Sequence, residues 1–130
     1  MSLQSYESNL DRNDANFVAL SPISLLRRTV KVHPDRIAVI HGDLRRSWRE
    51  TEIRCRRLAS ALLRRGIAKG DTVAILAPNI PEFVEASLGV PMIGAVLNSL
   101  NIRLDAEAIA FILKHGEAKV LLSDREFSPV

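Results

Sequence analysis

We predict an α/β fold from three features of this 130-residue sequence. Strand-like and helical segments alternate between residues 72 and 123, in the order strand, helix, strand, helix, strand, which is typical of two βαβ units in one parallel sheet. The first strand-like segment, residues 72–77, is apolar on both faces, as in a buried parallel strand. A hydrophobic content of 47% and a charged content of 25% indicate a folded chain of ordinary composition.

The amino-terminal part of the sequence predicts a tail, a helix and a β-hairpin. Residues 1–20 are polar and irregular, which is typical of a flexible tail. Ser21 and Pro22 are favoured at the N-cap and first turn of a helix, so we expect a helix to about residue 32. Residues 36–47 hold two short strand-like runs around a Gly-Asp turn, which predicts a β-hairpin.

Two capping-box patterns predict the starts of the next two helices. Residues 47–50 (Ser-Trp-Arg-Glu) place a glutamate three positions after a favoured cap residue, and the helix that follows should end at Gly66. Residues 79–82 (Asn-Ile-Pro-Glu) have the same spacing. They predict a helix to about Gly94, with a kink at Pro91.

The rest of the predicted sheet consists of strands at residues 95–98 and 119–123, with a helix between them. Asp105 is suited to cap this helix, and Gly116 is suited to end it. We expect the inward-facing residues to include Ile109, Phe111 and Ile112. Together with residues 72–77, these strands give a partial parallel-sheet layer.

The positive charge of the chain is concentrated between Arg45 and Arg65. This window holds eight arginines and two glutamates, a charge of +6, whereas the whole chain carries +3. One interpretation is a small basic α/β module that binds nucleic acid through this face. The other is the solvent-facing side of an amphipathic helix, because the apolar residues cluster on the opposite side at helical periodicity. The apolar side comprises Trp48, Thr51, Cys55, Leu58, Ala59 and Leu62.

Ligand-binding residues are expected where the strands of a parallel sheet end, after residues 77, 98 and 123. Asn79 follows the first strand, where it could offer its amide to a ligand or cap the next helix. Arg103 follows the second strand in a polar loop, where it could bind a phosphate or hydrogen-bond to carbonyls of the loop. Asp124 and Arg125 follow the third strand.

Several common kinds of site find no support in the sequence. Its six glycines form no phosphate-binding loop of the dinucleotide or nucleoside triphosphate type. The three histidines stand apart from one another and from any nucleophile, so we predict no metal site and no catalytic residue. Cys55 is the single cysteine and lies on the apolar side of its helix, where we expect it to be buried and unreactive.

We expect a cytoplasmic protein without a transmembrane segment. The longest nearly apolar run, residues 86–97, is too short to span a bilayer and is interrupted by Pro91. The first residues lack the basic and apolar regions of a secretory signal. A single cysteine allows no intrachain disulfide, which fits a reducing compartment.

Four segments, taken in order, resemble the amino-terminal region of AMP-forming acyl-CoA synthetases, which belong to the adenylate-forming superfamily of AMP-binding enzymes. They are residues 33–39 (HPDRIAV), 47–50 (SWRE), 66–82 (GIAKGDTVAILAPNIPE) and 94–104 (GAVLNSLNIRL). The resemblance covers about residues 22–128, and its specificity lies in the order and spacing of the segments. It implies that residues 21–130 are the leading part of a larger amino-terminal AMP-binding domain.

The resemblance implies a ligase that activates a carboxylic acid in two steps. The carboxylate attacks the α-phosphate of Mg-ATP to give an acyl-adenylate and pyrophosphate, and the thiol of CoA then displaces AMP. This chemistry needs a phosphate-binding loop, Mg²⁺ and a lysine. All three are missing from this sequence, so we expect a fragment that is inactive alone, holds no cofactor and has the rest of the enzyme as its partner.

The resemblance assigns a CoA-binding role to two residues, Asn101 and Arg103. The family's Asn-x-Arg-Leu segment, here residues 101–104, lies near the docked CoA nucleotide, and its arginine can approach the CoA phosphates. Ile102 departs from the pattern, because the family often has proline there. A sheet cut after residue 123 would also leave exposed strand edges, so we expect the fragment to self-associate.

Overall fold

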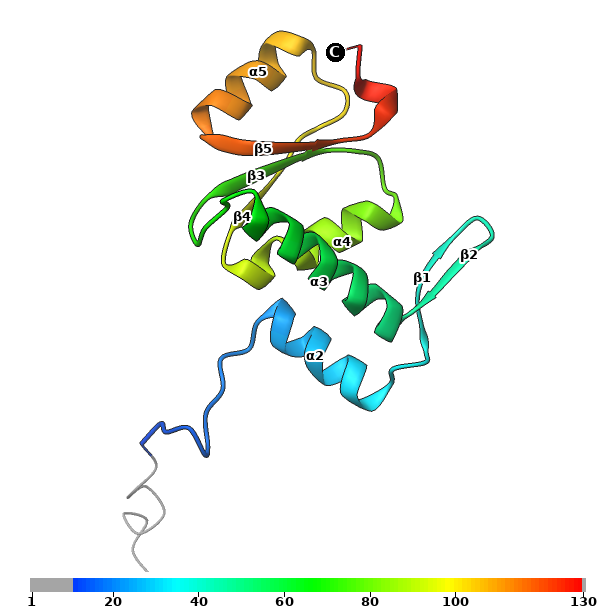
Figure 1. Cartoon of the computed structure of the whole chain (residues 1–130), viewed down its shortest axis with the longest axis vertical. Coiled ribbons are helices and arrows are strands. Elements are labelled where there is room, and N and C mark those ends of the chain that lie inside the picture. The colour runs from blue at the N-terminus through cyan, green and yellow to red at the C-terminus, as the bar shows by residue number, and fades with distance from the viewer. Residues whose placement is uncertain (1–10, 130) are drawn as a thin grey trace, which may run out of the picture.

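The computed structural model describes residues 11–129 and shows a parallel sheet with helices on both faces (Figure 1). The sheet has the strand order β4-β3-β5, formed by β3 (Thr72–Leu76), β4 (Val96–Ser99) and β5 (Ala118–Ser123). Helix α5 (Ala106–His115) covers one face, and helices α3 (Trp48–Arg64) and α4 (Pro81–Gly89) cover the other. The predicted α/β class and its βαβ layer are confirmed.

A hairpin and a helix precede this layer in the chain. Strand β1 (Ile37–His41) pairs antiparallel with β2 (Leu44–Ser47) in a separate two-stranded sheet, which confirms the predicted hairpin. Helix α2 (Pro22–Val32) lies against α3. Ser21 caps α2, since its hydroxyl accepts a hydrogen bond of 3.1 Å from the backbone N–H of Ser24.

Strand β3 lies at the centre of the core because both of its faces are covered. Val73 and Ile75 pack towards α3 and α4, whereas Ala74 and Leu76 pack towards α5. All four side chains are buried, as the two-sided apolar pattern predicts. Their buried neighbours are Leu62, Ala86 and Val90 on the first face, and Leu100 and Ile109 on the second.

Helix α3 begins as its sequence pattern predicts. The Ser47 hydroxyl accepts a hydrogen bond of 3.2 Å from the backbone N–H of Glu50, and the Glu50 carboxylate accepts one of 2.7 Å from the Ser47 N–H. These reciprocal bonds form the predicted capping box and satisfy two backbone donors at the helix start. The helix ends at Arg64, just before the predicted stop at Gly66.

Helix α4 does not begin as predicted. Its N-cap is Ile80, which makes no side-chain cap hydrogen bond, so the predicted capping of this helix by Asn79 is wrong. The physical reason is Pro81, which occupies the first helical position with a fixed φ and no N–H to be capped. The start of the helix therefore lies one residue too late for the Asn79 side chain to cap it.

The end of α4 and the start of β4 also differ from prediction. The helix ends at Gly89, and residues Pro91–Ile93 form a separate 3-10 turn instead of continuing a kinked helix to Gly94. Pro91 has no N–H to donate along the helix, which explains the break. Strand β4 starts at Val96, one residue later than expected.

Phe111 does not face inward as expected. Its side chain is 66% exposed and stacks on His115, with ring centroids 5.6 Å apart. Ile109 is the buried residue of α5. Phe111 lies two residues further along the helix, so its side chain faces the opposite side. The cap at Asp105 is confirmed by a hydrogen bond of 2.8 Å from the Ala108 N–H to its carboxylate.

The predicted tail is only partly described. Residues 11–20 are all exposed, whereas residues 1–10 lie outside the described part of the chain. Within residues 11–129, no helix combines the length and the apolar character needed to cross a bilayer.

Candidate functional site

The carboxyl ends of the three strands meet at one edge of the sheet, as predicted. The backbone N–H of Leu100, after β4, donates to the carbonyl of Ile75 at 2.9 Å. The N–H of Asp124, after β5, donates to the carbonyl of Leu76, also at 2.9 Å. The segments that follow β4 and β5 therefore flank the end of β3, which is where open parallel sheets bind ligands.

A cavity of about 580 Å³ opens at the ends of β3 and β5. Its wall is mostly aliphatic and comes from β3, β5, α3 and the residue before α4. Its polar lining residues are Glu82, Glu85, Ser123, Asp124 and Arg125. The lining contains no histidine or cysteine, so the arrangement fits a binding or packing surface better than a nucleophile with its base.

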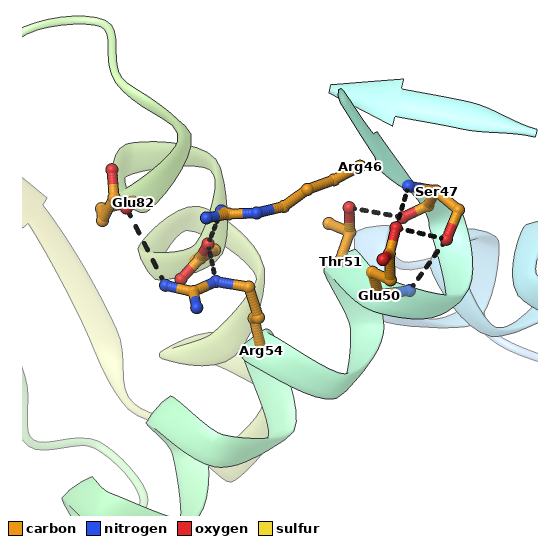
Figure 2. Close-up of polar contacts among 7 residues, drawn as sticks. Arg46, Ser47, Glu50, Thr51, Arg54 and Glu82 are labelled. Atoms are coloured by element: carbon orange, nitrogen blue, oxygen red, sulfur yellow. Dashed lines mark hydrogen bonds and ion pairs between the residues drawn. The ribbon is translucent and has the colours of Figure 1, made fainter. Parts of the chain in front are cut away.

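The Glu85 side chain of α4 lines this cavity and forms a charged network with two arginines. Figure 2 shows the side chains of Arg46 and Arg54 reaching towards each other, with Glu82 beside Arg54. The carboxylate is 9% exposed and accepts hydrogen bonds from Arg46 of β2 and Arg54 of α3. Arg54 also lies 3.8 Å from the carboxylate of Glu82. The hydrogen bond to Glu85 raises the pKa of Arg54. These side chains connect the hairpin, α3 and α4, and a carboxylate this buried requires such partners.

Sequence analysis did not identify Glu85, although helical spacing contains a signal for it. Glu85 is four residues from Pro81 and four from Gly89, and all three residues are buried on one side of α4. The spacing thus puts the carboxylate on the packed side of the helix. Its partners could not be read from the sequence, since Arg46 is 39 positions away and Arg54 is 31.

The basic window between Arg45 and Arg65 is partly neutralised by ion pairs. The predicted amphipathic helix is confirmed, because the buried residues of α3 are Thr51, Cys55, Ala59 and Leu62. Four arginines nevertheless bind carboxylates instead of pointing freely into solvent. The pairs are Arg46 and Arg54 with Glu85, Arg56 with Glu52 at 2.7 Å, and Arg49 with Asp35 at 3.4 Å.

Cys55 is fully buried on the inner face of α3, as predicted. Burial raises the pKa of its thiol to about 11, and the negative charge of Glu85 adds to the effect. The thiol is therefore protonated at neutral pH and unsuited to act as a nucleophile. The three histidines are exposed, and within residues 11–129 no three acidic, histidine or cysteine side chains gather to hold a metal ion.

Asn101 and Arg103 lie together in an exposed turn after β4. The Asn101 side-chain oxygen accepts a hydrogen bond of 3.0 Å from the backbone N–H of Arg103, which fixes the turn. The Arg103 guanidinium makes no ion pair within the described residues. Neither residue lines the 580 Å³ cavity, which borders β5, because β4 pairs with the opposite edge of β3.

Asn79 is exposed and is likewise separate from that cavity. It lines a different one of about 250 Å³, between the start of α4 and the hairpin residues Val39, Ile40 and His41. The structure thus brings Asn101 and Arg103 together, and it places Asn79 and Asp124 at two other sites. The sequence therefore located the edge at which the three strands end but not which strand ends share a cavity.

Comparison with known proteins gives consistent matches over most of the chain. Residues 26–129 match the family model described as AMP-binding enzyme. The chain is 54% identical over 119 residues to a peroxisomal acetate/butyrate–CoA ligase of Arabidopsis thaliana, covering 92% of this chain and 21% of that protein. It is 49% identical over 119 residues to an acetate–CoA ligase of Humulus lupulus, covering 92% of this chain and 21% of that protein.

Comparison with solved structures agrees with the sequence comparisons. The chain superimposes on a fatty acyl CoA synthetase of Mycobacterium tuberculosis with a TM-score of 0.79 at 34% identity, covering 82% of this chain and 22% of the other. This α/β layer is thus the fold of a domain from the adenylate-forming enzymes. The chain belongs to the AMP-binding enzyme family. It spans about a fifth of the length of the curated relatives it matches.

Proposed function

We propose that this chain is part of an AMP-forming acyl-CoA ligase, which joins a carboxylic acid to CoA while ATP is converted to AMP and pyrophosphate. The observation that supports this most strongly is the 54% identity to the acetate/butyrate–CoA ligase over 92% of the chain. The Humulus relative is also named for acetate. We therefore propose a short-chain carboxylic acid as the substrate.

We propose that this chain does not itself bind ATP or Mg²⁺. Its six glycines form no phosphate-binding loop, and residues 11–129 contain no metal-binding cluster. Glu85, the buried carboxylate of the 580 Å³ cavity, is already bound to two arginines. We therefore propose that other parts of the ligase bind Mg-ATP, that this chain alone is inactive, and that its own contribution is structural and towards CoA.

Arg103 and Asn101 fit the phosphates of CoA, which when bound supplies the thiol that accepts the acyl group. The Arg103 guanidinium is exposed and has no carboxylate partner within residues 11–129. A guanidinium binds phosphate through two parallel hydrogen bonds, for which a lysine cannot substitute fully. Asn101 would act as a positioning residue, because its side chain holds the backbone N–H of Arg103 at 3.0 Å.

ATP–pyrophosphate exchange with acetate, butyrate and benzoate tests the reaction and its substrate class. The ligase that contains this chain should catalyse exchange with acetate and butyrate, whereas the isolated 130-residue chain should not. Exchange by the isolated chain would contradict its proposed inactivity. Exchange with benzoate but not with the short acids would contradict the substrate class and leave the ligase assignment intact.

The CoA assignment is tested with Arg103→Ala in the same ligase. The KM for CoA should rise by about tenfold or more, because a hydrogen bond to a charged group is worth about 1.5–3 kcal/mol. ATP–pyrophosphate exchange should not change, since adenylation precedes CoA attack. Arg36→Ala, an exposed arginine before β1 that lies outside the candidate site, serves as the matched control. An unchanged KM for CoA in Arg103→Ala would refute the role.

The compartment and the association state are separate proposals. The sequence predicts the cytoplasm, while the Arabidopsis relative is named peroxisomal, and co-localisation with a peroxisomal marker distinguishes the two. We expect the isolated chain to self-associate, because Val96 of β4 and Leu121 of β5 are 52% and 43% exposed on the outer strands of the described sheet. A clean monomer at high concentration in sedimentation would contradict this.

Nucleic-acid binding, the alternative interpretation of the basic window, gains no support from the comparisons. The matched relatives are named as CoA ligases. Four of the arginines in the window are bound to carboxylates. The ligase proposal therefore accounts for the family match, whereas the alternative does not.

A further inference from the structure

Helices α2 and α3 present an exposed basic surface for which the ligase proposal has no use. Helix α2 has three basic side chains and no acidic one, and α3 has five basic and two acidic side chains. Together the two helices carry +6, twice the +3 of the whole chain. We define the α2–α3 basic surface by its exposed cations Arg27, Arg28, Lys31, Arg57, Arg64 and Arg65.

The cations of the α2–α3 basic surface differ from the other arginines of α3 in their partners. Arg49, Arg54 and Arg56 form ion pairs, but none of the six surface cations does so within residues 11–129. Arg64 donates to the Ser60 hydroxyl at 3.1 Å, and Arg65 donates to the carbonyl of Ala61 at 3.2 Å. Neutral acceptors leave the full positive charge available to an anionic partner.

Two neighbouring cavities join the cations of both helices into one surface. One cavity, of about 230 Å³, is lined by Arg27 of α2 together with Arg56 and Ser60 of α3. The other, of about 310 Å³, is also lined by Arg56 and Ser60, and adds Arg57 and Arg64. Because Arg56 and Ser60 belong to both cavities, Arg27 of α2 lies on one continuous surface with Arg57 and Arg64 of α3. Figure 1 shows α2 beside α3, on the side of α3 that is turned away from the sheet.

Exposed aliphatic side chains lie among these cations. Leu25 and Val32 of α2 are 53% and 52% exposed, and Ile53 and Leu63 of α3 are 41% and 55% exposed. Leu25, Arg28 and Val32 share one side of α2, since they are spaced three and four residues apart. Basic and aliphatic residues together on the outer side of helices are typical of proteins that bind at a membrane surface. None of these residues is aromatic, which disfavours base stacking with single-stranded nucleic acid.

We propose that the α2–α3 basic surface binds the surface of an anionic lipid bilayer. The guanidinium and ammonium groups contact lipid phosphates and carboxylates, and the four aliphatic side chains lie at the level of the headgroups. The opposite face of α3 packs on the core, so the contact is peripheral and leaves the fold unchanged. This proposal is independent of the ligase function, and it predicts that the protein associates with a membrane surface.

Co-sedimentation of the chain with phosphatidylcholine vesicles, with and without phosphatidylserine, tests the proposal. Binding should require phosphatidylserine and should weaken as the salt concentration rises. The double variant Arg57→Glu with Arg64→Glu should lower the vesicle partition coefficient by on the order of 1,000-fold, because it changes the charge of the surface by four units and each charge near an anionic membrane contributes on the order of 1 kcal/mol. Leu25→Ser with Leu63→Ser should lower it by about tenfold through the lost apolar contact.

The matched control is Arg45→Glu with Lys114→Glu, which makes the same change in net charge at two exposed cations elsewhere. This control should retain most of the vesicle binding, and circular dichroism should show that all variants are folded. Binding to neutral vesicles alone, no binding to either vesicle, or an equal loss in the control would overturn the proposal. Loss of duplex DNA binding in Arg57→Glu with Arg64→Glu, without any vesicle binding, would identify a nucleic-acid surface instead.

Discussion

The inner and outer faces of α3 carry arginines in two different situations. On the side that meets α4, Arg54 binds Glu85, whose side chain is 9% exposed, and the adjacent Cys55 is fully buried. On the outer side, Arg57 and Arg64 are exposed and make no ion pair with any described residue. The difference comes from the neighbouring element, because α4 supplies a carboxylate to one face and the outer face meets solvent.

This comparison shows that a cluster of one residue type need not have one role. Arg54 is committed to an internal contact, and its replacement would leave the buried Glu85 carboxylate with Arg46 as its remaining ion-pair partner among the described residues. Arg57 and Arg64 make no ion pair with any described residue and remain available to a partner. Stability measurements should therefore separate the two faces clearly.

The largest effect is expected from Glu85→Ala on the inner face. The change leaves Arg46, whose side chain is 17% exposed, without its carboxylate and leaves Arg54 with Glu82 alone, so the free energy of unfolding should fall by about 2–4 kcal/mol. Urea denaturation measures this change in the free energy of unfolding. Glu82→Ala is the control, since this carboxylate is 53% exposed and 3.8 Å from Arg54, and should cost less than about 1 kcal/mol. Equal effects of the two variants would contradict the larger role assigned to the buried carboxylate.

Gly89→Ala tests how closely α3 and α4 approach each other. A Cβ at this position would lie 2.9 Å from the carbonyl oxygen of Cys55 and 3.3 Å from a methyl carbon of Leu58. Because the nearer atom belongs to the backbone, the helices must move apart, at a cost of about 1–3 kcal/mol. Helix propensity alone favours alanine over glycine by about 1 kcal/mol. Thermal unfolding shows which of these two effects is larger. We expect a lower Tm, and an increase in Tm would show that the interface between α3 and α4 has room for the added methyl group.

The start of α3 offers a smaller effect that depends on pH. Ser47→Ala removes the side-chain cap and should lower the free energy of unfolding by about 1 kcal/mol. Hydrogen bonds from the Ser47 N–H and hydroxyl lower the pKa of Glu50, so the charged carboxylate stabilises the fold at neutral pH. This contribution is lost as the pH falls through the lowered pKa, below the ordinary range of glutamate.

Ser47→Ala also tests which hydrogen bond lowers the pKa of Glu50. Since Ser47→Ala removes only the hydroxyl donor, stability should vary less steeply with acid than in the parent chain, as followed by urea denaturation at several pH values. An unchanged acid dependence would mean that the backbone N–H alone lowers the pKa of Glu50.

The smallest effect is expected on the outer face. Arg57→Ala combined with Arg64→Ala should change the free energy of unfolding by less than about 0.5 kcal/mol, because exposed side chains without ion pairs contribute little to stability. Urea denaturation in parallel with Glu85→Ala makes the comparison direct. A loss approaching that of Glu85→Ala would show that the outer arginines have a structural role after all.

Two helix starts illustrate how far the sequence predicts local structure. Residues 47–50 and 79–82 have the same capping-box spacing, and only the first forms the box. In the second, Pro81 moves the helix start to a position that Asn79 cannot cap. Glu82 then lies near Arg54, a contact made between two helices. A capping motif is thus a reliable signal only where the residues between its ends do not impose a start of their own.

The candidate site was predictable in part. The strand ends that border it follow from the βαβ order of the sequence, and so does the turn that holds Asn101 and Arg103. Glu85 could be assigned to the packed side of α4 from its spacing with Pro81 and Gly89. Its pairing with Arg46 and Arg54 joins residues more than 30 positions apart, which no local pattern specifies.

The sequence by itself determined the elements of this protein and the family to which they belong. Apolar periodicity, cap residues and turn glycines act over a few residues, so the α/β order and the buried side of α3 can be read from the chain. Only the tertiary structure decided which arginines are bound and which remain exposed. The reason is physical, because the fate of a charge depends on the carboxylates and solvent that surround it in space.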